Sequence, residues 1–275
     1  MRLGKKISLI PDGCRTSVVC ACFVFFALPT APSWSQSPKR SADEVQDILR
    51  KLDERQRNMG DYEWGGVIYQ QERGKSDTAY RAVVYRRDEE DKLMILFTAP
   101  KTEAGKGYLR IDETLFRYDP TIGRWERTTE RERILGTNTR RADFDESRLA
   151  MEFRGTHVGD EKLGVHDVIH LRLEAKPGVD VAYPVVELWV DAKSLNPLKR
   201  QDFSASERLL RTLYMPTWQA YFSADKNAEV FVPQEIRVID ELEKGTNTII
   251  ILENVKLEPL PENIFTKAWL ESKSR

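Results

Sequence analysis

Two histidines four residues apart are the feature of this sequence that comes nearest to a catalytic motif. On a helix, His166 and His170 would share one face and could bind zinc, with Asp167 as a base. The segment continues as Leu171-Arg172-Leu173-Glu174, however, which alternates between apolar and polar residues as a strand does. On a strand the two side chains lie about 13 Å apart, from a rise of about 3.3 Å per residue. They could not chelate one ion together, so a zinc hydrolase built on His166 and His170 is a remote alternative.

Other residue types that commonly perform chemistry are missing or lie in predicted turns. The sequence contains no G-x-S-x-G nucleophile elbow, no P-loop and no dinucleotide fingerprint. Acidic residues cluster at 88–91 and 143–146, within turns, where we expect solvated charge rather than a catalytic pair. We therefore expect no enzymatic activity, no metal and no cofactor.

The N-terminal segment has the layout of a secretory signal. Arg2, Lys5, Lys6 and Arg15 precede an uncharged apolar run at 18–28, and small residues at Ser33 and Ser35 fit a cleavage site. The run is about 11 residues long, whereas a helix that spans a bilayer needs about 20. We expect a cleavable signal peptide at 1–35 and a single domain at 36–275. Acylation of Cys22, which would tether the protein to a membrane, is the alternative.

The composition of the segment after residue 35 limits its chemistry and its partners. All three cysteines (Cys14, Cys20 and Cys22) lie in the signal, so disulfides and thiolate nucleophiles are excluded from the mature domain. The mature segment has 39 lysines and arginines against 43 acidic residues, a net charge of about −4, with both signs interspersed. No basic stripe is present of the kind that phosphate backbones require, so we expect no nucleic-acid partner.

One helix and many strands are predicted in this domain. Ser41 and Glu44 form a capping box, and Val45, Ile48, Leu49 and Leu52 follow at the spacing of one buried helical face, which predicts a helix over 41–58. From residue 61 the pattern changes to a period of two, with turn residues every 8 to 12 positions, as in an antiparallel sheet or barrel. A loop with one or two helical turns, capped by Asp145, is predicted at 136–151, and a short helix at 263–270. The predicted strands are 61–68, 79–86, 92–99, 107–111, 115–118, 123–129, 152–158, 165–174, 185–191, 197–204, 209–215, 218–222, 232–241 and 247–255.

Several segments, in order along the chain, resemble the outer-membrane lipoprotein-sorting family, in particular its LolA-like branch. They are Phe97-Thr98-Ala99-Pro100 with Gly105-Lys106-Gly107, Leu115-Phe116-Arg117-Tyr118-Asp119-Pro120, Asp143-Phe144, Glu187-Leu188-Trp189-Val190-Asp191 with Pro197-Leu198-Lys199, and Phe265-Thr266. No single piece is specific, and the resemblance lies in their order. Phe116 stands where the family often has Trp.

The resemblance implies a fold and a function. The fold is α+β but mostly β, an incomplete, half-open antiparallel β-barrel with helices that cover an apolar interior. The function is that of a periplasmic carrier, which binds acyl chains of lipidated proteins or phospholipids and passes them from an inner-membrane donor to an outer-membrane acceptor. We expect the cavity to be lined by large apolar side chains of the strands: Trp64, Tyr85, Leu96, Leu109, Phe116, Tyr118, Trp189 and Trp218. A sensor or scaffold of the same fold, with a filled interior, is the alternative.

Overall fold

The computed structural model describes residues 39–57, 60–129, 132–145 and 147–274. The segment 1–35, which we interpret as a signal peptide, lies outside these residues, as does Cys22. In the described ranges no helix has both the length and the apolar character that crossing a membrane requires.

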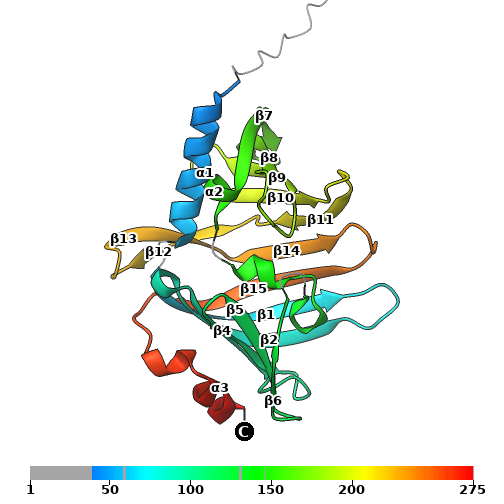
Figure 1. The fold of residues 1–275 in the computed structure, drawn as a ribbon, viewed down its shortest axis with the longest axis vertical. Coiled ribbons are helices and arrows are strands. Elements are labelled where there is room, and N and C mark those ends of the chain that lie inside the picture. Colours follow the sequence, from blue (N-terminus) through cyan, green and yellow to red (C-terminus); the bar gives the residue numbers. More distant parts are fainter. Residues whose placement is uncertain (1–38, 58–59, 130–131, 146, 275) are drawn as a thin grey trace, which may run out of the picture. The chain divides into compact units, whose positions relative to one another are not determined.

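One antiparallel sheet of 13 strands dominates the domain (Figure 1). Its order is β6-β5-β4-β3-β2-β1-β15-β14-β11-β10-β9-β8-β7, so two meanders meet where β1 pairs with β15. β6 and β7 stand at the two ends of this order, and β12 and β13 form a separate two-stranded sheet. The expectation of a mostly β, antiparallel chain with few helices is confirmed. The strands are β1 (Asp61–Gln71), β2 (Thr78–Arg87), β3 (Lys92–Ala99), β4 (Gly107–Ile111), β5 (Thr114–Asp119), β6 (Arg124–Arg127), β7 (Phe153–Leu163), β8 (His166–Ala175), β9 (Val185–Asp191), β10 (Pro197–Phe203), β11 (Leu209–Tyr214), β12 (Trp218–Ser223), β13 (Ala228–Pro233), β14 (Glu235–Asp240) and β15 (Asn247–Lys256).

The long N-terminal helix α1 (Ala42–Arg57) begins as the sequence predicts. The backbone N–H of Ser41 donates to Glu44 Oε2 at 2.7 Å, and the N–H of Glu44 donates to Ser41 Oγ at 3.2 Å. These reciprocal bonds satisfy N–H groups that have no partner inside the helix. The apolar face of α1 packs on strands β7 to β9, where Leu49 is fully buried with Leu171 and Leu173 (Figure 1).

Strand β3 is buried on both of its faces, which distinguishes it from a strand with one solvated side. Ile95 and Phe97 belong to a cluster with Val84 of β2, whereas Met94 and Leu96 belong to a second cluster on the opposite face. The second cluster is covered by the C-terminal segments η4 (Glu262–Phe265) and α3 (Lys267–Lys273), the short helix predicted at 263–270. Apolar residues therefore fill both faces of the sheet at this point.

The segment predicted as one strand at 232–241 is divided in the structure. Residues up to Pro233 pair with β12 as the hairpin strand β13, and β14 then joins the large sheet from Glu235. Pro233 has no N–H to donate, so a continuous ladder through this residue is unfavourable. The alternating pattern of the sequence continues across the break and gave no sign of it.

Short helical segments complete the described part of the chain. They are η1 (Asp88–Glu90), η2 (Ile134–Gly136), η3 (Arg141–Phe144) and α2 (Leu149–Glu152). The last two occupy the region 136–151, where the sequence predicts a loop with one or two helical turns.

Candidate functional site

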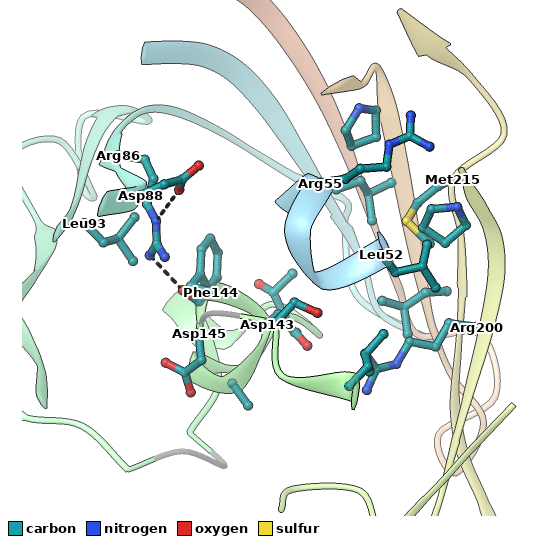
Figure 2. A pocket seen from close by; sticks show the side chains of 18 of the residues that line it. Leu52, Arg55, Arg86, Asp88, Leu93, Asp143, Phe144, Asp145, Arg200 and Met215 are labelled. Atoms are coloured by element: carbon teal, nitrogen blue, oxygen red, sulfur yellow. Dashed lines mark hydrogen bonds and ion pairs between the residues drawn. The ribbon is translucent and has the colours of Figure 1, made fainter. Parts of the chain in front are cut away.

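The main cavity of the domain lies over one face of the large sheet and has a volume of about 1360 Å³. Small-molecule sites usually measure about 300–1,000 Å³, so this cavity can accommodate a larger ligand. Strands of both meanders contribute to its walls, together with the C-terminal end of α1, the η3 segment and the hairpin β12–β13. Figure 2 shows part of the lining, with Leu52 and Met215 on one side and Leu93 on the other.

The apolar wall follows from the pairing of neighbouring strands. Val84 of β2 pairs with Ile95 of β3, and Ala82 pairs with Phe97, so these side chains point to the same side of the sheet. The wall continues on β14 and β15 with Ile236 and Ile250, which also pair. Apolar lining residues of the strands include Trp64, Ile68, Ala82, Val84, Leu93, Ile95, Phe97, Leu188, Leu213, Trp218, Val230, Phe231, Ile236 and Ile250, and Met215 directly follows β11.

Two buried arginines form a charged cluster at one side of this wall. Arg86 of β2 bonds to Asp88 at 3.1 Å and to Asp91 at 2.5 Å, and Arg110 of β4 binds Asp91 and Asp145 at 2.6 and 2.5 Å. Burial alone would lower the pKa of Arg86, but the charges of Asp91 and Asp88 and the nearby Tyr62 raise it. The expectation of solvated turn charges at 88–91 is wrong for Asp88 and Asp91, which pair with Arg86 and Arg110, whereas Glu89 and Glu90 are exposed as expected.

A second buried cluster surrounds Arg211 of β11. Its Nη1 and Nη2 bond to Asp143 at 2.8 and 2.5 Å, and its Nε bonds to Asp202 at 2.6 Å. Burial would raise the pKa of Asp143, but the charge and hydrogen bonds of Arg211 hold it below its usual value. Asp143 therefore forms an ion pair that the sequence did not predict, although the residue remains exposed.

The segment η3 is held between these two clusters. Its Phe144 carbonyl accepts hydrogen bonds from Arg86 at 3.1 Å (Figure 2) and from Arg110 at 2.9 Å, while Asp143 binds Arg211. Arg86 and Arg110 belong to one meander and Arg211 to the other. The cavity is thus bordered by a segment that both halves of the sheet hold in place.

Helix α2 is capped by a carboxylate of α1, not by Asp145. Asp53 accepts hydrogen bonds from Ser147 Oγ at 2.6 Å and from the N–H groups of Leu149 and Ala150 at 2.8 Å. Asp145 instead ends η3 and binds Arg110. The predicted cap is wrong because a residue distant in sequence supplies the acceptor.

Replacing Asp53 with alanine is expected to lower the free energy of unfolding by about 2–3 kcal/mol. The substitution removes three hydrogen bonds and leaves the N–H groups of two half-buried residues without their acceptor. Chemical denaturation measures the change, with Asp47→Ala, a half-exposed carboxylate of the same helix, as the control that should change little. Equal losses in the two variants would show that Asp53 does not fix α2.

Of the eight side chains predicted to line a cavity, Trp64 and Trp218 do so. Five others lie on the opposite face of the sheet, since Tyr85 pairs with Met94, and Met94 pairs with Leu109. Trp189 is outside the cavity lining and is stacked on His170, with ring centroids 4.1 Å apart. The five residues on the opposite face, which pack against α3 and η4, are Tyr85, Leu96, Leu109, Phe116 and Tyr118.

The charged lining residues were missed because none has a motif. Arg86 does occupy a cavity-facing position of β2, two residues beyond Val84, so alternation along the strand could have placed it there. Its acidic partners could not be identified in this way.

The two histidines of the predicted strand lie on β8, which confirms the strand assignment. His166 bonds to Asp191 at 3.0 Å, and His170 bonds to Glu187 at 3.2 Å. Each histidine thus has its own carboxylate. Across the part of the chain that the structure covers, no three His, Cys, Asp or Glu side chains are grouped as metal ligands.

Comparison with known proteins gives a family and a fold. A family model with the description "Uncharacterized protein" matches residues 89–272, more than half of the chain. The chain belongs to this family. No curated protein sequence matches the chain.

Solved structures of low sequence identity share its architecture. A domain assigned to outer membrane lipoprotein sorting from Vibrio parahaemolyticus is 19% identical, with a TM-score of 0.72, over 84% of this chain and 100% of that chain. A LolA superfamily protein from Nitrosomonas europaea is 23% identical, with a TM-score of 0.66, over 82% and 98%. A DUF1329 family protein from Desulfovibrio piger is 17% identical, with a TM-score of 0.71, over 83% and 98%. The resemblance stated from the sequence is therefore confirmed, as a match to the LolA superfamily fold.

Proposed function

We propose that this chain is a non-catalytic periplasmic carrier, which binds acyl chains of lipoproteins or lipids in its cavity and moves them toward the outer membrane. A cleavable signal peptide at 1–35 directs its export. A single domain at 36–275, an incomplete barrel covered by helices, binds the acyl chain. The fold shared with a lipoprotein-sorting domain supports this assignment. Donor and acceptor proteins at the two membranes are the partners that such a carrier needs.

The observation that carries the proposal is the size of the cavity together with its apolar wall. Each buried methylene contributes about 0.8 kcal/mol, so an acyl chain gains most of its affinity from contact with such a wall. Release then requires a state of weaker binding or a receiving partner, because a carrier of constant affinity does not deliver its cargo.

The cavity also bears on the alternative function as a sensor or scaffold. The apolar face of α1 is fully packed at one end of the domain, on β7 to β9, as a filled interior would require. The space beside it remains open under Leu52, which lines the cavity at the C-terminal end of the same helix. This open space favours the carrier.

Native mass spectrometry of the full chain, purified without harsh detergent, tests the proposal. We expect bound lipid or acylated peptide, and we expect Ile236→Asp to reduce the loaded fraction at least about tenfold, since it places a charge on the apolar wall. Ile251→Asp is the matched control. Ile251 is a half-buried residue of the adjacent strand that is outside the cavity lining.

A wild-type chain that retains no lipid under any mild condition would refute the carrier function. Equal loading of the two aspartate variants would instead place the lipid somewhere other than this cavity. Circular dichroism of both variants checks that they remain folded.

A further inference from the structure

Most of the buried or half-buried charged side chains around the cavity already have a partner. Arg86 and Arg110 share Asp91, and Lys226 binds Glu89 at 3.0 Å. Arg200, which Figure 2 shows at the edge of the pocket, bonds through Nε to Asp202 at 2.6 Å. These groups are neutralised within the protein and do not require a ligand.

Arg55, near the C-terminal end of α1, differs from them. Its Nη1 donates to the carbonyl of Ser194, and its guanidinium lies 4.9 Å from the ring centroid of Phe231. Among the residues described, no carboxylate forms an ion pair with Arg55, and burial lowers its pKa. Withdrawing a charge from water without a counter-ion costs free energy, which an anionic ligand would offset.

A second cation lies beside the contact that Arg55 makes. Lys193 directly precedes Ser194, is exposed, and lines the same cavity. Asp191, the acidic residue nearest to Lys193 in sequence, is outside the cavity lining. It already accepts hydrogen bonds from Ser194 and from the Lys193 N–H. Burial would raise the pKa of Asp191, but the hydrogen bonds from Ser194, His166 and the Lys193 N–H lower it to about 2. Asp191 therefore remains engaged in its own turn.

Apolar side chains adjoin Arg55 on the cavity side. Leu52 lies one turn before Arg55 on α1, Figure 2 shows Met215 on the same side of the pocket, and both line the cavity. An amphiphile could therefore contact a guanidinium with its headgroup and apolar side chains with its first methylenes. The carbonyl end of a helix disfavours anions, so binding at this end of α1 depends on the side chain of Arg55 itself.

We propose that Arg55, assisted by Lys193, binds the anionic headgroup, a carboxylate or a phosphate, of an amphiphile whose acyl chain lies along the apolar wall. This inference rests on the carrier function and adds a class of ligand to it. The planar guanidinium can donate two parallel hydrogen bonds to either group, which an ammonium cannot.

Binding of four probes with the same palmitoyl chain to the full-length protein tests the inference. The probes are palmitate, a lysophospholipid with an anionic phosphoglycerol headgroup, a lysophospholipid with a zwitterionic choline headgroup, and monopalmitoyl glycerol. We expect at least tenfold tighter binding of an anionic probe than of monopalmitoyl glycerol. The better of the two anionic probes distinguishes a carboxylate from a phosphate ligand.

Arg55→Gln is expected to weaken binding of the preferred anionic probe about 10- to 100-fold and to leave monopalmitoyl glycerol unchanged, because a hydrogen bond to a charged group contributes about 1.5–3 kcal/mol. Arg55→Lys should keep part of the preference. Arg81→Gln, which alters an exposed arginine of β2 outside the cavity, is the control.

Equal affinities of the wild-type protein for anionic and neutral probes would overturn the headgroup site and leave the carrier function intact. Failure of every probe to bind would count against the carrier function itself. Should Arg55→Gln not fold, the preference of the wild-type protein and its reduction in Lys193→Gln decide the matter.

Discussion

Replacing Arg211 with methionine is expected to destabilise the protein by about 3–5 kcal/mol at neutral pH. Arg211 is 4% exposed and is bonded to Asp143 and Asp202, so its removal leaves Asp143 without its cation and the buried Asp202 with Arg200 alone. Domains usually have a total stability of about 5–15 kcal/mol, so this loss is a large fraction. Urea denaturation measures it, with Arg81→Met, at an exposed arginine, as the control that should lose much less.

The pH dependence of the same variant follows from the lowered pKa of Asp143. In the wild-type protein the ion pair stabilises the fold above the ordinary carboxyl pKa of about 3.9, and this contribution is lost as the pH falls through the lower folded value. In Arg211→Met the carboxylates favour protonation, so the loss should be largest at neutral pH and smaller near pH 4. The double variant Asp143→Asn/Arg211→Met should be more stable than Arg211→Met alone. A loss that is independent of pH and unaffected by the second substitution would show that packing, not charge, explains the effect.

Truncating Leu109 to alanine is expected to cost about 2–5 kcal/mol of stability without reducing lipid loading. Leu109 is fully buried and packs with Met94, Leu96 and Leu270 on the face of the sheet away from the cavity. The cost is that of lost apolar burial and of the space left behind. Thermal denaturation and native mass spectrometry, both on the full chain, provide the two readouts.

The control for Leu109→Ala is Ile111→Ala on the same strand. Ile111 is 37% exposed, so a change of less than about 1 kcal/mol is expected. A Leu109→Ala protein that stays folded but loses its lipid would show that ligand binds on this face after all, as the sequence alone led us to expect.

The sequence by itself determined the local elements of this protein. The capping box of Ser41 and Glu44 acts over three residues, and the helix that it starts is present as predicted. The alternation that predicts strands is equally local, and even the two-histidine segment could be assigned to a strand. Such features depend on neighbours in the chain, which a sequence displays directly.

Tertiary structure decided which face of the sheet bears the cavity. Alternation separates Tyr85 from Val84 and Leu96 from Ile95 but does not identify the inner face when both faces are apolar, as they are on β3. The difference arises from α3 and η4, which fill one face with Leu270 and Ile264 and leave space on the other. For this reason Trp64 lines the cavity and Leu96 and Leu109 belong to a packed core.

Long-range pairing also decided the state of the charges. Asp143 and Arg211 are 68 residues apart in sequence and 2.5 Å apart in space, so no local pattern could show that the carboxylate in a predicted turn is paired with a buried arginine. The sequence likewise does not show that Arg55 contacts Ser194 and Phe231, which lie far from it along the chain. The sequence gives the type of each side chain. The burial and the ion-pair partners of that side chain determine its charge state and its function, and they are set only when the two meanders pack together.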